Sequence, residues 1–138
     1  MMRYASDGRP LPTPTDTSRP FFEGAREKRL VLQRCPRDGF FFYPRSHCPS
    51  CLGVDWQWET VSGRGSVHAF TVDRVGHDPA LASQVPFAVA IVELDEGPRM
   101  SANIVGCEVD AVSVGMRVEA AFEDVDDITL VRFRPCGD

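Results

Sequence analysis

The sequence lacks any long apolar run. No stretch approaches the roughly 20 consecutive apolar residues that a transmembrane helix needs. The first ten residues also lack the apolar core of a signal peptide. These absences predict a cytoplasmic protein with no membrane contact. With 138 residues, 43% hydrophobic and 25% charged, the chain has the composition of one ordinary globular domain or two very small ones.

The sequence also lacks the motifs of common catalytic sites. It has no G-x-S-x-G, no H-E-x-x-H, no glycine-rich phosphate loop and no dinucleotide fingerprint. Of its three histidines, His68 is expected in a strand, and His77 beside Asp78 forms the best catalytic pair but has no nucleophile nearby in sequence. Cys107 has no histidine close to it in sequence. We therefore predict no catalytic residue, and an enzyme that uses His77 or Cys107 is a minor alternative.

The charge is unevenly distributed. The net charge is −5, with +4 on residues 1–53 and −9 on residues 54–138. The acidic half argues against nucleic-acid binding, which depends on clustered Lys and Arg. The basic half fits an acidic partner surface or a phosphorylated cofactor, and equally a solvated helix face. The acidic run 123–127 lacks the spacing of a calcium loop and is interpreted as a solvated turn.

Three of the five cysteines have metal-ligand spacing. Cys48-Pro49-Ser50-Cys51 is a complete C-x-x-C turn, whereas Cys35-Pro36-Arg37-Asp38 has an aspartate where the second cysteine would stand. Two such turns build a zinc ribbon, because the four tetrahedral ligands come from two tight loops. Strands are expected before and after the first turn. Each turn is followed by a glycine, at 39 and 53, which permits the positive φ that we expect there.

The fourth ligand is the open question of this site. Zn²⁺ accepts a carboxylate oxygen as well as a thiolate, so a Cys35, Asp38, Cys48 and Cys51 set is chemically reasonable. His47 competes with Asp38, but it adjoins Cys48 and would point away in a standard knuckle. A ribbon without metal, held by its phenylalanines, is the third possibility. In each case the site is expected to be structural, because the subdomain is too small to fold on apolar burial alone.

A short helix is expected before the ribbon. Residues 1–15 are rich in Pro, Thr and Gly and predict a flexible or wrapping arm. The stretch 16–20 supplies cap-type side chains and a proline for a helix that we expect to run to about Lys28. Phe21 and Phe22 lie on one face and pack either on the ribbon or on a partner protein. We predict that the partner interface comprises Phe21, Phe22, Arg26 and the long loop with His77.

The rest of the chain predicts a run of strands without an intervening helix. An alternating segment at 55–61 is followed by five longer segments separated by turn signals: 65–75, 87–94, 99–105, 116–123 and 128–133. Five strands of this length favour a small closed barrel of the OB type. The longest connection between them, 76–86, is the loop expected to carry function.

The order of these parts resembles the domain-of-unknown-function thirty-five family. Six segments carry the resemblance: Arg19–Gly24, Leu32–Cys35, Tyr43–Arg45, the turn from Cys48 to Cys51, Val92–Arg99 and Val114–Val118. A further match is Gly63-x-Gly65-x-Val67, and the resemblance covers about residues 16–134. It implies a mainly β fold with a short N-terminal helix, a rubredoxin-like zinc ribbon and a five-stranded OB-fold barrel. We expect an arm at 1–15, the helix and ribbon at 16–60, and the barrel domain at 61–138.

The resemblance also implies a role. Members of this family are usually small non-catalytic subunits, or fused domains, bound to a thiolase, a thiolase-like aldolase or an enoyl-CoA hydratase. They stabilise the enzyme and help to shape its acyl-CoA channel in the shortening of steroid or aromatic acyl-CoAs. We therefore expect a hetero-oligomer with acyl-CoA near the interface and a structural zinc. The alternatives are a hydratase subunit or a single-stranded nucleic-acid-binding module.

Overall fold

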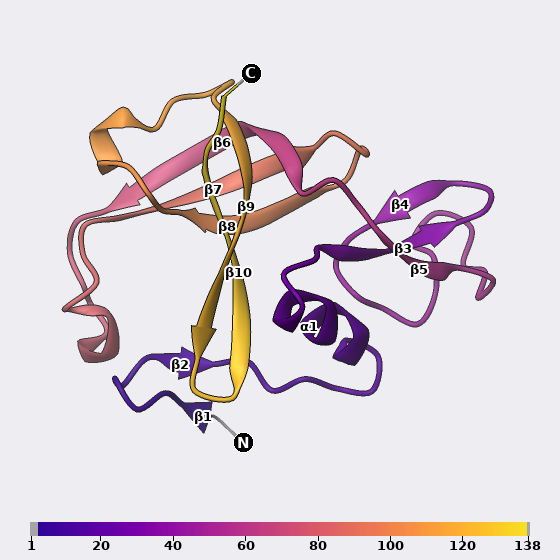
Figure 1. The fold of residues 1–138 in the computed structure, drawn as a ribbon, viewed down its shortest axis with the longest axis horizontal. Helices are drawn as coiled ribbons and strands as arrows, with labels where there is room; N and C mark the ends of the chain where they lie inside the picture. The colour runs from indigo at the N-terminus through magenta and orange to yellow at the C-terminus, as the bar shows by residue number, and fades with distance from the viewer. Residues whose placement is uncertain (1–2, 138) are drawn as a thin grey trace.

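The computed structural model describes residues 3–137. It contains a two-stranded N-terminal sheet, one α-helix, a three-stranded ribbon and a closed five-stranded barrel (Figure 1). No helix among the described residues is both long and apolar enough to cross a membrane. The mainly β fold class expected from the sequence is confirmed.

The helix α1 (Arg19–Arg26) lies between the ribbon and the barrel and contacts both β3 and β10 (Figure 1). Pro20 occupies its first turn, where its missing N–H costs nothing. The predicted end at about Lys28 was two residues too long, because Lys28 adopts a φ of 63°, which reverses the chain instead of extending the helix. Phe21, Gly24 and Ala25 form its buried face.

The ribbon is a three-stranded antiparallel sheet of order β4-β3-β5. Its strands are β3 (Val31–Cys35), β4 (Gly39–Phe41) and β5 (Gln57–Thr60). The first metal turn connects β3 to β4, and a longer loop with the second turn connects β4 to β5. The Gln33 side chain fixes that loop, since its amide donates to the Arg45 carbonyl at 2.7 Å and its oxygen accepts from the Arg45 amide at 3.0 Å.

The barrel closes in the order β10-β8-β7-β6-β9. Its strands are β6 (Arg64–Asp73), β7 (Phe87–Leu94), β8 (Arg99–Ile104), β9 (Arg117–Val125) and β10 (Ile128–Pro135). All pairs are antiparallel except β8 with β10, which is parallel at Ile104 and Phe133. The five predicted strand segments are confirmed, each with ends within two residues. Short 3₁₀ turns, η1 (Pro79–Leu81) and η2 (Val109–Ala111), lie in the connections after β6 and β8.

One continuous apolar core fills the barrel and extends to the ribbon. Alternate residues of β7 point inward, and Ala88, Ala90, Val92 and Leu94 are all buried. The same cluster includes Leu32 from β3 and Phe21 from α1. The helix therefore connects the ribbon to the barrel by shared apolar packing.

The segment with β1 and β2 lies against the tip of the β9–β10 hairpin (Figure 1). Strands β1 (Arg3–Tyr4) and β2 (Pro10–Leu11) pair with each other, and Ala5 and Leu11 are buried on Val125 and Ile128. The connecting residues of the hairpin are acidic, and basic residues of the arm and helix contact them. The run 123–127, interpreted above as a solvated turn, is therefore also the point where the N-terminal segment is held.

Candidate metal centre

The two turns of the ribbon bring four ligand-type side chains together. Cys35 ends β3, and the chain turns through Asp38 into Gly39, whose φ of +85° confirms the expected left-handed position. In the second turn, the left-handed residue is Leu52, with φ 62°, and not Gly53 as expected. The Leu52 amide donates to the Cys48 carbonyl at 2.8 Å, and the Gly53 amide donates toward the Cys51 sulfur at 3.4 Å. Both turns thus point their side chains inward.

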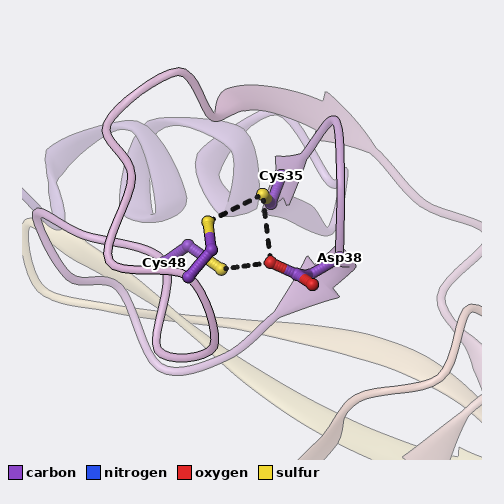
Figure 2. A group of neighbouring side chains, drawn as sticks. Cys35, Asp38 and Cys48 are labelled. Atoms are coloured by element: carbon purple, nitrogen blue, oxygen red, sulfur yellow. Dashed lines mark hydrogen bonds between the residues drawn. The ribbon is translucent and has the colours of Figure 1, made fainter.

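Three distances within the cluster match the edges of a tetrahedral metal site. One carboxylate oxygen, Oδ2 of Asp38, lies 3.7 Å from Cys35 Sγ and 3.5 Å from Cys48 Sγ, and the sulfurs of Cys35 and Cys51 are 3.7 Å apart (Figure 2). Metal–sulfur bonds of about 2.3 Å and metal–oxygen bonds of about 2.0–2.2 Å give tetrahedral edges of about 3.8 Å between sulfurs and about 3.5–3.7 Å between sulfur and oxygen. The four ligand atoms all lie within 4.8 Å of one another. The residues present therefore fit Zn²⁺, with Asp38 offering a single oxygen.

The four side chains differ in exposure. Cys35 and Cys48 are buried, Cys51 is half-buried and Asp38 is exposed. Phe41 and Trp56 pack beside the sulfurs, and the Trp56 indole donates to the Ser46 carbonyl at 2.8 Å. The cluster is thus closed by apolar rings on the protein side and by the carboxylate on the solvent side. A site with four protein ligands and no open position is structural in character.

The cluster also shifts the pKa values of its members. Interactions with the thiols of Cys51, Cys48 and Cys35 outweigh burial and hold the pKa of the Asp38 carboxyl group below its usual range. The Gly53 amide lowers the pKa of the Cys51 thiol, but Asp38, burial and the other two thiols raise it more, to about 11. The amide of Asp38 lowers the pKa of Cys35. When metal binds, it supplies the positive charge that lets several neighbouring ligands ionise together.

His47 is not part of this cluster. Its ring Nδ1 lies 2.7 Å from the Ser46 hydroxyl oxygen at the exposed surface. Among residues 3–137, the ligand atoms that gather are those of Cys35, Asp38, Cys48 and Cys51. The geometry therefore favours Asp38 over His47 as the fourth ligand.

The predicted interface residues occupy two separate places. Phe21 is only 8% exposed, and its ring centroid lies 5.5 Å from that of Phe42 in the ribbon. Phe22 is half-buried and packs edge-to-face on Phe21 at 5.2 Å. Arg26 donates to the Asp127 carbonyl at 2.6 Å. His77 is exposed on the loop between β6 and β7, where its neighbour Asp78 caps η1 by accepting from the Ala80 amide at 2.9 Å.

The N-terminal segment is held on the acidic turn by charge pairs. Arg3 contacts Asp127 at 3.0 Å and Lys28 contacts Asp124 at 2.9 Å. Arg9 lies 3.2 Å from Glu123, whose other oxygen accepts from Arg132 at 3.1 Å. Burial of Glu123 would raise its pKa, but the hydrogen bonds from the two arginines outweigh burial and lower it. The opposite charges of the two halves of the sequence therefore meet within the molecule.

Two grooves on the outer face of the barrel were not predicted. One, of about 740 Å³, lies between the arm and the loop with η1, and the other, of about 540 Å³, lies beside α1 and the Phe42–Pro44 segment. They share Val89, Asn103, Leu130 and Arg132 in their walls. One sequence signal could have revealed them. The outward positions of β7 and β8 carry no charge apart from Glu93 and Arg99 at one end.

Comparisons with known proteins agree with this architecture. One family model, described as the rubredoxin-like zinc ribbon domain of ChsH2, matches residues 22–58, and another, the C-terminal OB-fold domain of ChsH2, matches residues 58–123. A DUF35 domain-containing scaffold protein of Methanocaldococcus jannaschii is 35% identical over 115 residues, which are 77% of this chain and 81% of that protein.

Two further proteins are similar over most of this chain. A probable enoyl-CoA hydratase alpha subunit of Thermomonospora curvata is 36% identical over 129 residues. That match covers 92% of this chain but only 40% of the length of the hydratase subunit. A solved structure described as the Ltp2-ChsH2(DUF35) aldolase superimposes with a TM-score of 0.79 at 35% identity, covering 91% of this chain and 98% of that one. The chain belongs to the DUF35 family and combines its rubredoxin-like zinc ribbon with its OB-fold barrel.

Proposed function

We propose that this chain is a non-catalytic accessory subunit of an acyl-CoA-processing enzyme. One observation carries the proposal: the chain covers 98% of the DUF35 chain of an aldolase at 35% identity. The match is to the whole of that chain, whereas only 40% of the hydratase alpha subunit is matched. The likeness to the DUF35 chain of an aldolase favours a thiolase-like aldolase or a thiolase as the partner enzyme. A subunit of an enoyl-CoA hydratase is the alternative.

The architecture suits a scaffold that stabilises its partner and helps to enclose an acyl chain. The barrel and ribbon share one core, so their surfaces are held in a fixed relation. The two grooves lie next to each other on one face and have walls from the arm, the helix, the ribbon and the barrel. Covered by an enzyme subunit, such a face would form part of a channel for an acyl-CoA. The family resemblance implies a steroid or aromatic acyl group.

Co-expression with the thiolase-type or hydratase-type enzyme encoded next to this chain tests the proposal. We expect a stable complex in size-exclusion chromatography and higher activity or solubility of the enzyme than when it is produced alone. An acyl-CoA series with steroid, aromatic and short aliphatic groups measures the substrate class. A chain that stays monomeric and leaves the enzyme unchanged in both respects would contradict the proposal.

We also propose that Cys35, Asp38, Cys48 and Cys51 hold a structural zinc. The tetrahedral edges described above and the shared Oδ2 of Asp38 support this set. Because metal-binding thiols must be reduced, the set also supports a cytoplasmic location. When bound, zinc would tie the two turns together and add to the folding free energy of the ribbon.

Substitution of Asp38 tests the ligand set. Asp38→Ala should lower zinc affinity, whereas Asp38→Cys should keep it. With Co²⁺ as a probe, the sulfur charge-transfer absorption of the wild type should be about three quarters of that of Asp38→Cys, because three thiolates would become four. Equal absorption in the two proteins, or full zinc retention in Asp38→Ala, would exclude Asp38 as a required ligand.

Phe21, Phe22, Arg26 and His77 stay as proposed interface residues. Phe22 is half-buried and Arg26 is exposed on α1, so both can contact a partner. Phe21 is buried and would act by fixing the position of α1. His77 is exposed on the loop between β6 and β7, and this loop lies far from α1 (Figure 1). The dissociation constants of the Arg26→Ala and His77→Ala variants for the same partner enzyme test the helix and the loop separately. An unchanged dissociation constant for one of them would remove that place from the interface.

A further inference from the structure

The second half of β6 has an open edge. β6 pairs with β7 through Asp73, but its pairing with β9 covers only Arg64–Ser66. The register shifts at a bulge between Val67 and Ala69, where the strand leaves β9. Within residues 3–137, no strand pairs with residues 69–73 on that side. Their backbone groups on that side are therefore without a ladder partner, which makes this edge a template for another strand.

The first part of this open segment is exposed and carries no Lys, Arg, Asp or Glu. His68, Ala69, Phe70 and Thr71 are all exposed, although they lie in the middle of a ten-residue strand, and Phe70 is 38% exposed. Val72 and Asp73, which end the strand, are half-buried. Soluble proteins often protect an edge of this kind with lysine, proline or a bulge. Neither lysine nor proline occurs between Arg64 and Asp73, and the bulge lies before the open segment. An open edge with an exposed aromatic residue, beside an uncharged sheet face, fits a surface that a partner covers.

Two central rows of the outer face beside the edge are also without charge. Cross-strand pairing aligns Ala69, Ile91 and Ser101 in one row across β6, β7 and β8, and Thr71, Val89 and Asn103 in the next row. Residues aligned in this way point to the same face of the sheet. The Tyr43 hydroxyl lies 2.8 Å from the Ser101 hydroxyl, so the first row continues onto the ribbon. Tyr43 itself is half exposed.

The charges that border this face have partners within the chain. At one end Arg99 contacts Glu93 at 3.0 Å, and at the other the Asp73 carboxylate accepts from the Val75 amide at 3.0 Å. Beside Asn103, Arg132 contacts Glu123 at 3.1 Å. A protein surface that complements the face must therefore be uncharged and apolar in its centre. The two uncharged rows therefore favour an uncharged partner segment over a strongly basic or acidic one.

We infer that the open edge of β6 and the uncharged face of β6, β7 and β8 form the docking surface for the partner enzyme. The inference rests on the proposed function and names the occupant as an extended, uncharged segment of the enzyme subunit. Its backbone adds to β6 as a further strand, and its apolar side chains lie on Ala69, Ile91 and Tyr43. Both grooves include Val89 and Asn103 of the same face, so docking there closes them between the two proteins.

Charged substitutions on the open segment test the docking surface. Ala69→Lys and Thr71→Lys place a charge on the exposed strand without filling the core, so the isolated variants should unfold at the wild-type temperature. The co-expressed adjacent enzyme should bind each of them at least tenfold more weakly than the wild type. Val54→Lys is the control, because Val54 is also an exposed, uncharged residue but lies in the ribbon loop and not on β6. It should bind as the wild type does.

The two proposals fail in different ways in this experiment. If the wild type binds the enzyme and Ala69→Lys and Thr71→Lys bind equally well, the docking surface is wrong and the accessory function stands. If the wild type does not bind, the accessory function fails. Amide hydrogen exchange gives a direct measure, since residues 69–73 should gain protection in the complex and the amides of Ala88–Val92 should not change. Protection of 69–73 in the isolated chain, together with a dimer mass, would assign the edge to a second copy and overturn the inference.

Discussion

The ribbon and the barrel reach a stable structure by different means. The barrel buries a large apolar set from all five strands, including the fully buried Ala88, Val92, Val118 and Phe133. The far side of the ribbon has only Cys35, Phe41 and Cys48 in its buried cluster. A cluster of this size supplies little of the free energy needed to order three strands and two long turns. Zinc bound by the four proposed ligands would supply what apolar burial lacks.

The two regions are nevertheless not independent. Leu30 and Leu32 belong to the same apolar cluster as the barrel residues, and Phe21 joins them from the helix. The ribbon therefore has one face that shares the barrel's core and one face that depends on the metal cluster. Removal of a metal ligand should therefore unfold mainly the ribbon turns. Removal of a buried apolar side chain from the barrel should lower the stability of the whole molecule.

Removal of a metal ligand should have the largest effect. Cys48→Ala removes a buried ligand, and we expect loss of bound zinc and a destabilisation of the ribbon on the order of 5 kcal/mol or more, because metal binding is coupled to folding. Zinc content by mass spectrometry and hydrogen exchange of residues 31–60 measure this. Cys136→Ala, a cysteine outside the cluster, should keep both at the wild-type level. Unchanged exchange in the zinc-free Cys48→Ala protein would show that the ribbon does not need metal.

A large-to-small change in the barrel should come next. Phe133 is fully buried, and Phe133→Ala should lower the free energy of unfolding by about 3–5 kcal/mol through lost burial and a residual cavity. Zinc content of the folded protein should stay at the wild-type value. Chemical denaturation measures the free energy of unfolding. Phe70 is a partly exposed phenylalanine on β6, so Phe70→Ala is the control, with an expected change under about 1 kcal/mol. A loss of zinc in folded Phe133→Ala would contradict the separation of the two regions.

A substitution at the contact between α1 and β3 should have a smaller effect. Alanine in place of a helical glycine usually stabilises by about 0.5–1 kcal/mol. At Gly24, however, an added Cβ would overlap Val31 Cγ2 and lie 3.1 Å from Val31 Cβ. Gly24→Ala should therefore destabilise by about 1–3 kcal/mol. In the double variant with Val31→Ala, the cost of Gly24→Ala should largely disappear, and thermal unfolding of all four proteins measures this coupling.

Much of this organisation could be predicted from the sequence. The strands of the barrel follow from alternating apolar residues between turn signals, since that alternation reports a half-buried strand directly. The metal cluster follows from spacing, because a C-x-x-C turn fixes both side chains within one local loop. Asp38 follows Cys35 at the same spacing at which Cys51 follows Cys48, and this spacing identifies it as a ligand candidate.

Other features depend on contacts that spacing does not reveal. The left-handed residue of the second turn is Leu52 although a glycine follows it, because hydrogen bonds of the turn and not residue preference decide the backbone there. The pairing of Arg3 and Arg9 with the acidic turn joins residues more than 110 positions apart. The open edge of β6 results from the point at which β9 diverges, and no residue type marks that point.

The smallest effect should come from the charge pairs that hold the arm. The pKa of Glu123 is below its ordinary value of 4.5 in the folded protein, because the hydrogen bonds from Arg9 and Arg132 outweigh burial. A carboxyl group whose pKa is depressed by folding contributes stability above its unfolded pKa, and that contribution is lost as the pH falls through the folded pKa. Arm docking should therefore be constant at neutral pH and weaken below about pH 4. Since Glu123 is partly exposed, the change should stay under about 1 kcal/mol and shrink at high salt.

Amide resonances of residues 3–12 measure arm docking, and Glu123→Gln should remove its acid response. Glu119→Gln, on the same strand but paired with Arg134, should leave it in place, and an identical response in both variants would mean that the apolar contacts of Ala5 and Leu11 alone hold the arm.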